Sequence, residues 1–246
     1  REGMIVFSPD SARNRISKSH MTLNSTDEPD GEINGRGPSR LQISLASDLT
    51  PPSPAHNLLM AFHFGQAPAH AEHPAVVSPR LNAIDQDELY ETWWIDDAVE
   101  YSTKGSLRIA ECADYAVVVY EHDESGYDDH EAFVHQAYGE LLDAVASTRH
   151  PRLVKVWNYL GGINEGEGDL ERYRQFSVGR AIAFSESGVD NEDAPTGTGV
   201  GTMNDRGLSI IALCSNQDFA LAENPRQVSA FHYPREYGPK SPKFGR

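Results

Sequence analysis

The sequence predicts a protein of the α+β class. Short apolar segments with strand-like composition occupy most of its first half. One strongly amphipathic helical segment follows, and a further strand-like segment comes directly after it. This order is typical of a layer in which a helix packs on one face of a β-sheet. The length of 246 residues permits one large domain or two small ones.

The N-terminal part contains a weakly structured segment and then a series of strands. Residues 1–39 are predicted to be a weakly structured, flexible segment, because the stretch 24–39 is dense in turn-forming residues and nearly free of large apolar side chains. Leu41, Ile43 and Leu45 then alternate with polar residues, as in a half-buried strand. Runs of apolar, aromatic and β-branched residues predict four further strands, at Leu58–Gly65, Leu89–Ile95, Leu107–Ala110 and Tyr115–Tyr120.

The clearest helix comes next. Asp128 and Asp129 can cap its N-terminus, where unpaired backbone amides favour an anion. Apolar residues recur at steps of three and four from Phe133 to Val145, which places them on one helix face. Pro151 ends the helix, and Arg152–Tyr159 has the composition of a strand.

The remaining elements are predicted from shorter patterns. The loop Gly161–Gly168 is acidic and lacks the Gly-Lys-Ser/Thr of a phosphate-binding loop. We expect a short helix at Asp169–Phe176, a loop at Asp190–Met203 and a buried strand at Leu208–Leu213, with Ala181–Phe184 either continuing the helix or beginning a strand.

Composition argues against several classes of partner. A net charge of −16 and a pI near 4.9 argue against nucleic acid. No run of about eighteen apolar residues is present, so no membrane span is predicted. Without a signal-peptide pattern, the two cysteines predict free thiols in the cytoplasm. Because the first residue is Arg1 rather than Met, we expect either a fragment of a longer protein or a chain with added residues at its start.

The sequence contains no recognisable metal site or nucleophile motif. The spacing of its histidines matches no common zinc pattern. The acidic cluster around Glu124 and His130 lacks the regular spacing of a calcium loop, so we interpret it as a solvated helix entry. For Trp93 and Trp94 we expect one ring in the core and one on the surface, because neighbours in a strand face opposite ways. No metal and no cofactor are predicted.

Two clusters of Arg and Tyr suggest an anionic ligand. The closing segment, Asn224–Arg246, has a charge of +4 within a chain of −16 and interleaves cations with aromatic rings. A binding site and a solvated basic tail are both compatible with this composition. Its candidate substrate-binding residues are Arg226, Gln227, Tyr233, Arg235 and Tyr237.

The second cluster lies in Arg172–Arg180 and contributes Tyr173, Arg174 and Arg180 as candidate binding residues. Arginine side chains bind carboxylates through paired hydrogen bonds. The two clusters together would suit a small ring compound with more than one carboxylate. The alternative is a network of arginines and acids that only ties the two segments together.

Three motifs resemble those of a known enzyme family, the chorismatases. They are Val156-Trp-Asn-Tyr-Leu160, Glu171-Arg-Tyr-Arg-Gln-Phe-Ser-Val-Gly-Arg-Ala181 and the stretch from Glu223 to Arg246, which includes Tyr-Gly-Pro-Lys-Ser-Pro-Lys-Phe-Gly-Arg. Their residues and their order along the chain are highly specific for this family. The resemblance extends over residues 40–246.

The resemblance implies a fold and a domain organisation. Chorismatases resemble two tandem units of the YjgF (reactive-intermediate-deaminase, chorismate-mutase-like) fold. On this basis residues 1–39 are a flexible segment, and residues 40–160 a degenerate YjgF-like domain. Residues 161–246 would be a connecting region and the start of a largely truncated second, catalytic unit. Relatives of this fold also suggest a homotrimer.

The resemblance also implies an activity. Chorismatases release pyruvate from the enolpyruvyl ether of chorismate without a cofactor, leaving a dihydroxycyclohexadienoate or a hydroxybenzoate. A glutamate is the expected general acid, and the family pattern places it beyond Arg246. The alternatives are a non-catalytic YjgF-like module that binds a carboxylate ligand or a partner chain, and imine or enamine hydrolysis of the deaminase type.

Overall fold

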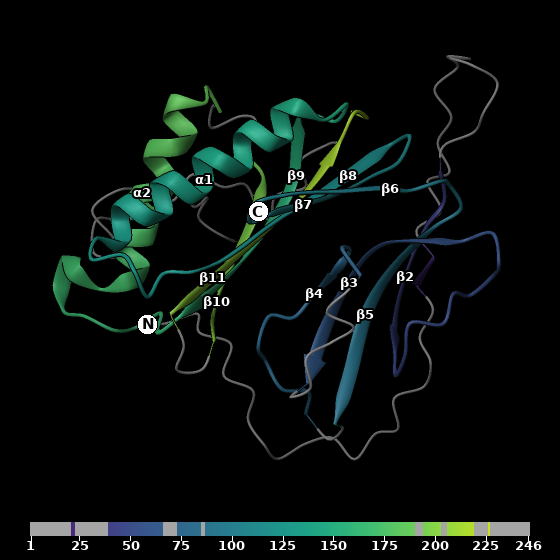
Figure 1. The fold of residues 1–246 in the computed structure, drawn as a ribbon, viewed down its shortest axis with the longest axis horizontal. Coiled ribbons are helices and arrows are strands. Elements are labelled where there is room, and N and C mark those ends of the chain that lie inside the picture. Colours follow the sequence, from purple (N-terminus) through teal and green to yellow (C-terminus); the bar gives the residue numbers. More distant parts are fainter. Residues whose placement is uncertain are drawn as a thin grey trace.

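The computed structural model describes residues 39–65, 73–84, 87–189, 194–202 and 206–218, together with the backbone of residues 21–22 and Arg226. These parts form three layers, with α-helices covering one face of a six-stranded sheet and a five-stranded sheet on its other face (Figure 1). The α+β class is therefore confirmed.

The five-stranded sheet has the order β1-β2-β5-β3-β4. Its strands are β1 (Met21–Thr22), β2 (Leu41–Ala46), β3 (Asn57–Gly65), β4 (Val76–Val77) and β5 (Glu88–Ile95). Both β2 and β3 pair antiparallel with the central β5, whereas β4 is parallel to β3. The three longer strands confirm the predicted ones. Apart from β1 and Ser39, the predicted flexible segment 1–39 lies outside the described residues.

The six-stranded sheet has the order β10-β9-β11-β8-β7-β6. Its strands are β6 (Glu100–Lys104), β7 (Leu107–Glu111), β8 (Tyr115–Asp123), β9 (Arg152–Gly161), β10 (Thr196–Thr202) and β11 (Gly207–Ser215). β11 pairs antiparallel with both β8 and β9, although it follows them by many residues in sequence. The predicted domain boundary between residues 160 and 161, which stays a prediction, falls inside β9 of this sheet.

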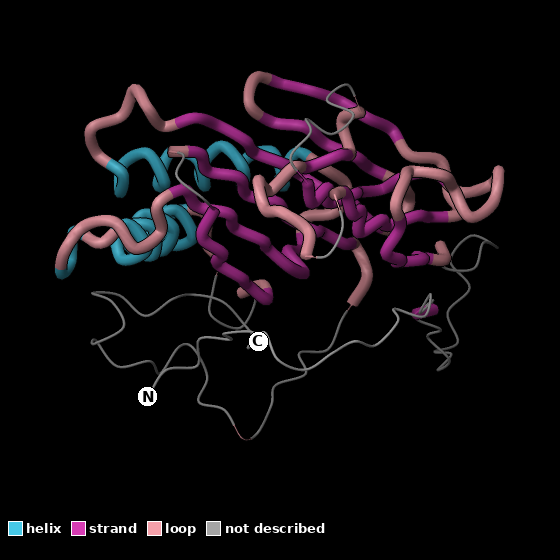
Figure 2. The backbone as a smooth tube through the Cα atoms, turned by 90° about the horizontal axis from the view of Figure 1, so that it is seen from below, coloured by secondary structure: helices cyan, strands magenta, loops and turns pink. Residues whose placement is uncertain are grey.

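The helices α1 (His130–Ser147) and α2 (Arg172–Glu186) pack against each other on one face of this sheet (Figure 2). Asp129 caps α1 as predicted, because its carboxylate accepts a hydrogen bond of 3.0 Å from the amide of Ala132. Gly179 lies where the helices approach, since a Cβ there would lie 2.5 Å from the carbonyl oxygen of Glu131. The close approach therefore depends on a missing side chain.

The start of α2 differs from the prediction. The helix begins at Arg172, and the residues before it, Gly168–Leu170, form a separate 3₁₀ turn. It also continues to Glu186, so the segment Ala181–Phe184 is helical rather than a strand.

The prediction of a loop over Asp190–Met203 is wrong for Thr196–Thr202. These residues form β10, an edge strand that pairs parallel with β9. The glycines of β10 allow neighbouring side chains to approach the strand closely. A Cβ at Gly201 would lie 2.5 Å from Cγ2 of Ile163, and one at Gly199 would lie 3.2 Å from Cε2 of Tyr173. The loop and helix that follow β9 therefore lie directly over β10.

Two apolar cores hold the layers together. Tyr138 of α1 and Phe176 and Phe184 of α2 belong to the core between the helices and the six-stranded sheet. The core between the sheets contains both Trp93 and Trp94, which are 8% and 5% exposed. The expectation that one of these rings lies on the surface is wrong, because the residues on both faces of β5 are buried here.

Candidate functional site

Tyr173 and Arg180 are brought together on α2. The ring of Tyr173 stacks on Phe176 at a centroid distance of 6.2 Å, and the guanidinium carbon of Arg180 lies 5.0 Å from the centroid of the same ring. Tyr173 is half-buried, whereas Arg180 is only 3% exposed. The two residues therefore meet around Phe176.

Arg180 belongs to a buried polar group that joins both helices to the sheet. The hydroxyl of Tyr138 donates to Oδ1 of Asn158 at 2.5 Å, and Nδ2 of Asn158 donates to the carbonyl of Thr198 in β10 at 2.8 Å. Burial raises the pKa of Tyr138 to about 12, with Arg180 acting in the opposite direction. Tyr138 is therefore a neutral hydrogen-bond donor, and Arg180 is held beside it.

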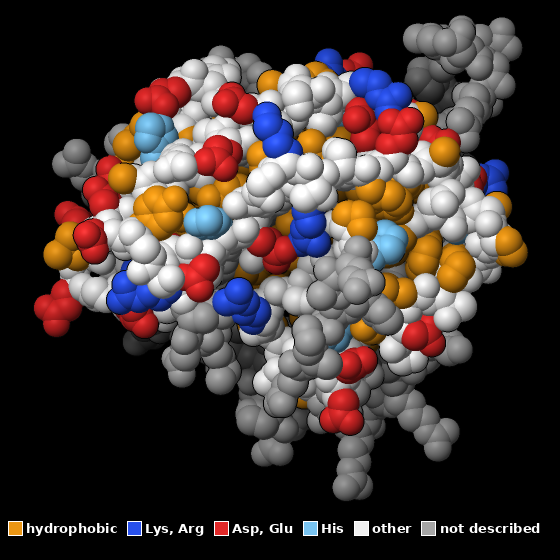
Figure 3. Space-filling view, in the orientation of Figure 1, with side chains coloured by type: hydrophobic (Ala, Val, Ile, Leu, Met, Phe, Trp, Pro, Cys, Tyr) orange, Lys and Arg blue, Asp and Glu red, His pale blue; other side chains and the backbone are white. Residues whose placement is uncertain are grey.

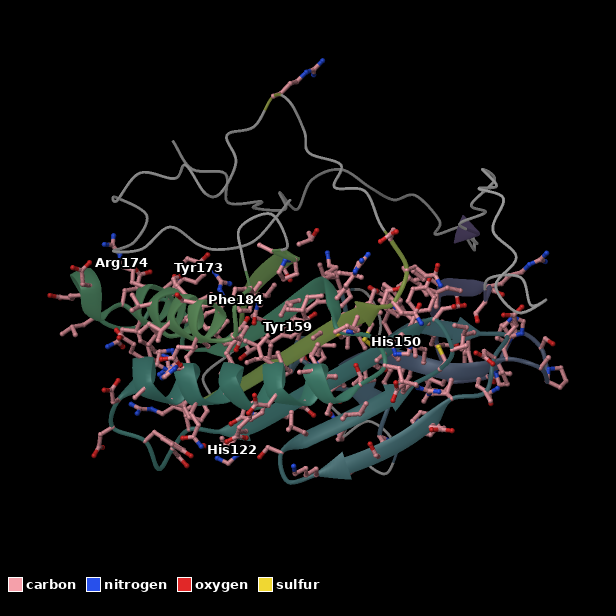
Figure 4. All side chains as sticks on the ribbon, turned by 90° about the horizontal axis from the view of Figure 1, so that it is seen from above. His122, His150, Tyr159, Tyr173, Arg174 and Phe184 are labelled. Atoms are coloured by element: carbon pink, nitrogen blue, oxygen red, sulfur yellow. The ribbon has the colours of Figure 1, made fainter. Side chains whose placement is uncertain are left out.

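Arg174 lies apart from this pair. Its guanidinium forms ion pairs with Asp169 at 3.2 Å and with Glu171 at 3.3 Å. Figure 4 shows Arg174 near the outer end of α2, with Tyr173 closer to the sheet. Both of these partners, Asp169 and Glu171, are acids close to Arg174 in sequence, as in a local network of arginines and acids.

Of the closing segment, only Arg226 is described, and it is exposed. Gln227, Tyr233, Arg235 and Tyr237 lie outside the described residues. A binding site shared by the closing segment and α2 therefore stays a prediction.

A buried charged cluster of Glu124, His130 and Arg172 was not predicted. Their side chains are 3%, 7% and 11% exposed. One carboxylate oxygen of Glu124 pairs with Arg172, and the other lies 2.6 Å from Nδ1 of His130. The interpretation of Glu124 and His130 as a solvated helix entry is wrong. Arg172, from a distant segment, lies over the end of β8 and covers them.

The charge state of the cluster follows from this geometry. Arg172 already compensates the charge of Glu124, so a protonated His130 would leave an uncompensated buried charge. Burial accordingly lowers the pKa of His130 to about 4. It also lowers the pKa of Arg172, with the nearby Arg206 as a second cause. At neutral pH the cluster is an ion pair hydrogen-bonded to a neutral histidine.

The cluster borders a pocket of about 210 Å³ between the beginnings of α1 and α2. The lining includes Glu124, Tyr127, His130, Arg172, Gln175 and Arg206. It combines charges of both signs with a phenol and an amide, and could hold a small polar molecule. On the side shown in Figure 3, acidic and basic side chains are interspersed rather than separated by sign.

Other chemistry is limited in the part of the chain that the structure describes. There, no three His, Cys, Asp or Glu side chains lie close enough to hold a metal ion. Cys112 and Cys214 are both buried and unpaired, which confirms the predicted free thiols. None of the described helices combines the length and the apolar character required to cross a bilayer.

Comparison with known proteins identifies the family. Residues 91–214, about half of the chain, match the family model "Chorismatase FkbO/Hyg5-like, N-terminal". The chain belongs to the chorismatase family. The matched range begins in β5 and ends in β11, so it contains α1, α2 and the Glu124 cluster. The predicted resemblance is thereby confirmed.

Individual chorismatases agree with this assignment. A chorismatase of Streptomyces hygroscopicus is 34% identical over 165 residues, which cover 66% of this chain and 47% of that protein. A 3-hydroxybenzoate synthase of the same organism is 28% identical over 157 residues, or 63% of this chain and 46% of the relative. The chain thus spans about half the length of the curated relatives it matches.

A crystal structure of a chorismatase has the same fold. It is 27% identical in sequence and superimposes with a TM-score of 0.69, covering 84% of this chain and 63% of the other. The chorismatase fold and the α+β class are therefore shown, whereas the roles of single residues in substrate binding stay predictions.

Proposed function

We propose that this protein acts as a chorismatase, which cleaves the enolpyruvyl ether of chorismate and releases pyruvate. The observation that carries the proposal is the family match over residues 91–214, because it contains the helix with Tyr173 and Arg180. The second product would be a hydroxybenzoate or a dihydroxycyclohexadienoate.

The proposed chemistry needs no cofactor. A carboxylic acid protonates the methylene carbon of the enolpyruvyl group, and the resulting oxocarbenium ion is attacked by water or by an oxygen of the substrate. The ether bond then breaks and pyruvate leaves. We assign this general acid to none of the described residues. Glu124 is unsuited to the role, because both of its oxygens are engaged by Arg172 and His130.

The described residues would serve substrate binding. Tyr173 offers a hydroxyl on a ring fixed by Phe176, and Arg226 offers an exposed guanidinium for a carboxylate. Arg180 is too deeply buried to reach a ligand without rearrangement, so we propose that it supports the ring of Phe176. For Gln227, Tyr233, Arg235 and Tyr237 the proposed role is unchanged.

The direct test has two parts. The natural full-length protein is incubated with chorismate, and pyruvate is measured by a coupled dehydrogenase assay while the ring product is identified by chromatography. Binding of chorismate to the 246-residue chain is measured by calorimetry. If the folded full-length protein releases no pyruvate from chorismate, the proposed enzymatic activity is refuted. Binding without turnover would instead support the alternative, a non-catalytic module for a carboxylate ligand.

Further features of the protein remain proposals. A cytoplasmic location is supported by the two unpaired thiols, since reducing compartments keep thiols free. The division into residues 1–39, 40–160 and 161–246 and the assembly as a homotrimer rest on the family resemblance alone.

A further inference from the structure

Glu124 connects the beginnings of both helices. It directly follows β8, is 2% exposed, and has one oxygen on Arg172 and the other 2.6 Å from His130. Arg172 is the first residue of α2, and His130 is the first residue of α1. A single carboxylate therefore holds two helix ends that are 42 positions apart in sequence.

The connection extends to the sheet. Nε of Arg172 donates to the carbonyl of Gly161 at the end of β9, with a distance of 2.9 Å. The amide of Glu124 donates to the carbonyl of Arg206, just before β11, at 2.8 Å. The cluster thus joins the ends of three neighbouring strands to the beginnings of α1 and α2.

The other ion pairs described at the beginning of α2 are local, between Arg174 and the nearby Asp169 and Glu171. The N-cap residue of α2, Glu171, makes no capping hydrogen bond with its side chain. The first amides are bound by loop carbonyls instead, from Arg172 to Glu165 at 2.9 Å and from Tyr173 to Ile163 at 3.1 Å. Because Tyr173 directly follows Arg172, a shift of Arg172 would move the Tyr173 ring over β10.

We propose that Glu124 is a positioning residue for substrate binding: it anchors Arg172 and thereby keeps Tyr173 in place against Phe176 and Gly199. The inference rests on the proposed role of Tyr173 in binding chorismate. Loss of the Glu124 charge would leave Arg172 buried without its counter-ion, which favours movement of the helix end. Small displacements of this kind reduce binding and catalysis strongly.

The test compares Glu124→Gln with a matched control, Glu140→Gln, which makes the same change at the half-buried partner of the exposed Gln136 on α1. Hydrogen exchange of the amides at the beginning of α2 is measured by mass spectrometry, and chorismate affinity by calorimetry. We expect faster exchange at residues 172–176 and a roughly tenfold higher Kd in Glu124→Gln only. If exchange there is unchanged, the anchoring role is refuted.

The two readouts separate this inference from the proposed function. If the full-length protein neither binds chorismate nor releases pyruvate, the proposed function fails, while hydrogen exchange still tests the anchor. If exchange increases but Kd does not change, positioning of a binding residue is refuted. Should Glu124→Gln fail to fold, Glu124→Asp keeps the charge but withdraws the carboxylate from Arg172, and the same exchange and affinity changes are expected.

Discussion

At the scale of single residues, burial decides the chemistry of the titratable groups. His130 is buried against a carboxylate that Arg172 already neutralises, so its uncharged form is favoured in the folded protein. Arg180 is buried beside Phe176 and Tyr138, whereas Arg174 stays partly exposed and pairs with acids. Three arginines within one helix therefore have three different roles.

The first prediction concerns the pH dependence of stability. The pKa of His130 is lowered from 6.5 to about 4 on folding, so the unfolded chain binds more protons between these values. We therefore expect His130 to make the free energy of unfolding rise with pH between about 4 and 6.5, and to cause no further change above pH 6.5. The full contribution is on the order of 3 kcal/mol.

Urea unfolding of the wild type and of His130→Gln over this pH range measures the effect. His122→Gln serves as the control on the neighbouring strand, where the ring bonds to Ser106 instead. The stability difference between wild type and His130→Gln should grow with pH up to about 6.5. A difference that is independent of pH would contradict the buried neutral state.

The second prediction concerns substrate contacts. Tyr173→Phe removes one hydroxyl and should raise the Kd of chorismate about fivefold, while Arg226→Ala removes a carboxylate partner and should raise it tenfold or more, roughly. Calorimetry measures both. Arg152→Ala, which breaks an exposed pair with Asp218, is the control for loss of a surface arginine. The site assignment is wrong if neither Tyr173→Phe nor Arg226→Ala weakens binding.

At the scale of elements, the contact between α1 and α2 depends on one glycine. A Cβ at Gly179 would lie 2.5 Å from the carbonyl oxygen of Glu131 and 3.0 Å from Cβ of Val134. Backbone atoms of α1 cannot move aside as a flexible side chain would. At Gly201 of β10 the neighbour is a side chain instead, since a Cβ there would lie 2.5 Å from Cγ2 of Ile163.

The third prediction compares two helical glycines. Gly179→Ala should destabilise the protein by about 1–3 kcal/mol through overpacking, despite the higher helix propensity of alanine. A Cβ at Gly139 would have no neighbouring atom within 4 Å. The higher helix propensity of alanine should therefore make Gly139→Ala more stable by about 0.5–1 kcal/mol. Chemical unfolding measures the change in the free energy of unfolding, which should be negative for Gly179→Ala and positive for Gly139→Ala. Equal changes in both variants would argue against the close contact between α1 and α2 at Gly179.

At the scale of the whole molecule, the six-stranded sheet is shared by two cores. Cys214 lies in the core between this sheet and the helices, and Cys112 in the core between the two sheets. Burial raises the pKa of both thiols, that of Cys214 to about 12, so neither is reactive in the folded protein. The reactivity of each thiol therefore indicates whether the core around it is folded.

The fourth prediction is that both cores unfold together. Because the strands of one sheet line both of them, we expect Cys112 and Cys214 to become reactive towards a thiol reagent at the same urea concentration. The variants Cys112→Ala and Cys214→Ala allow each thiol to be followed alone. Separate midpoints would instead indicate two independent units, and would support a domain boundary within the chain.

Much of the architecture could be predicted because it depends on local patterns. The apolar periodicity of α1 and its cap at Asp129 depend on near neighbours, and so do the β-branched runs of β8 and β11. The three motifs at Val156–Leu160, Glu171–Ala181 and Glu223–Arg246 together also carried enough information to indicate the chorismatase family. For these features, the chemical reason lies within a few positions in the sequence.

The tertiary structure alone decided which polar side chains are buried. Glu124 lies in an acidic stretch that resembles a solvated surface, and Arg172, 48 positions away, compensates its buried charge. Likewise, the glycines of β10 resemble a loop until Tyr173 and Ile163 are placed over them. Burial and pairing depend on contacts between distant segments, whereas strand, helix and cap preferences depend on neighbouring residues.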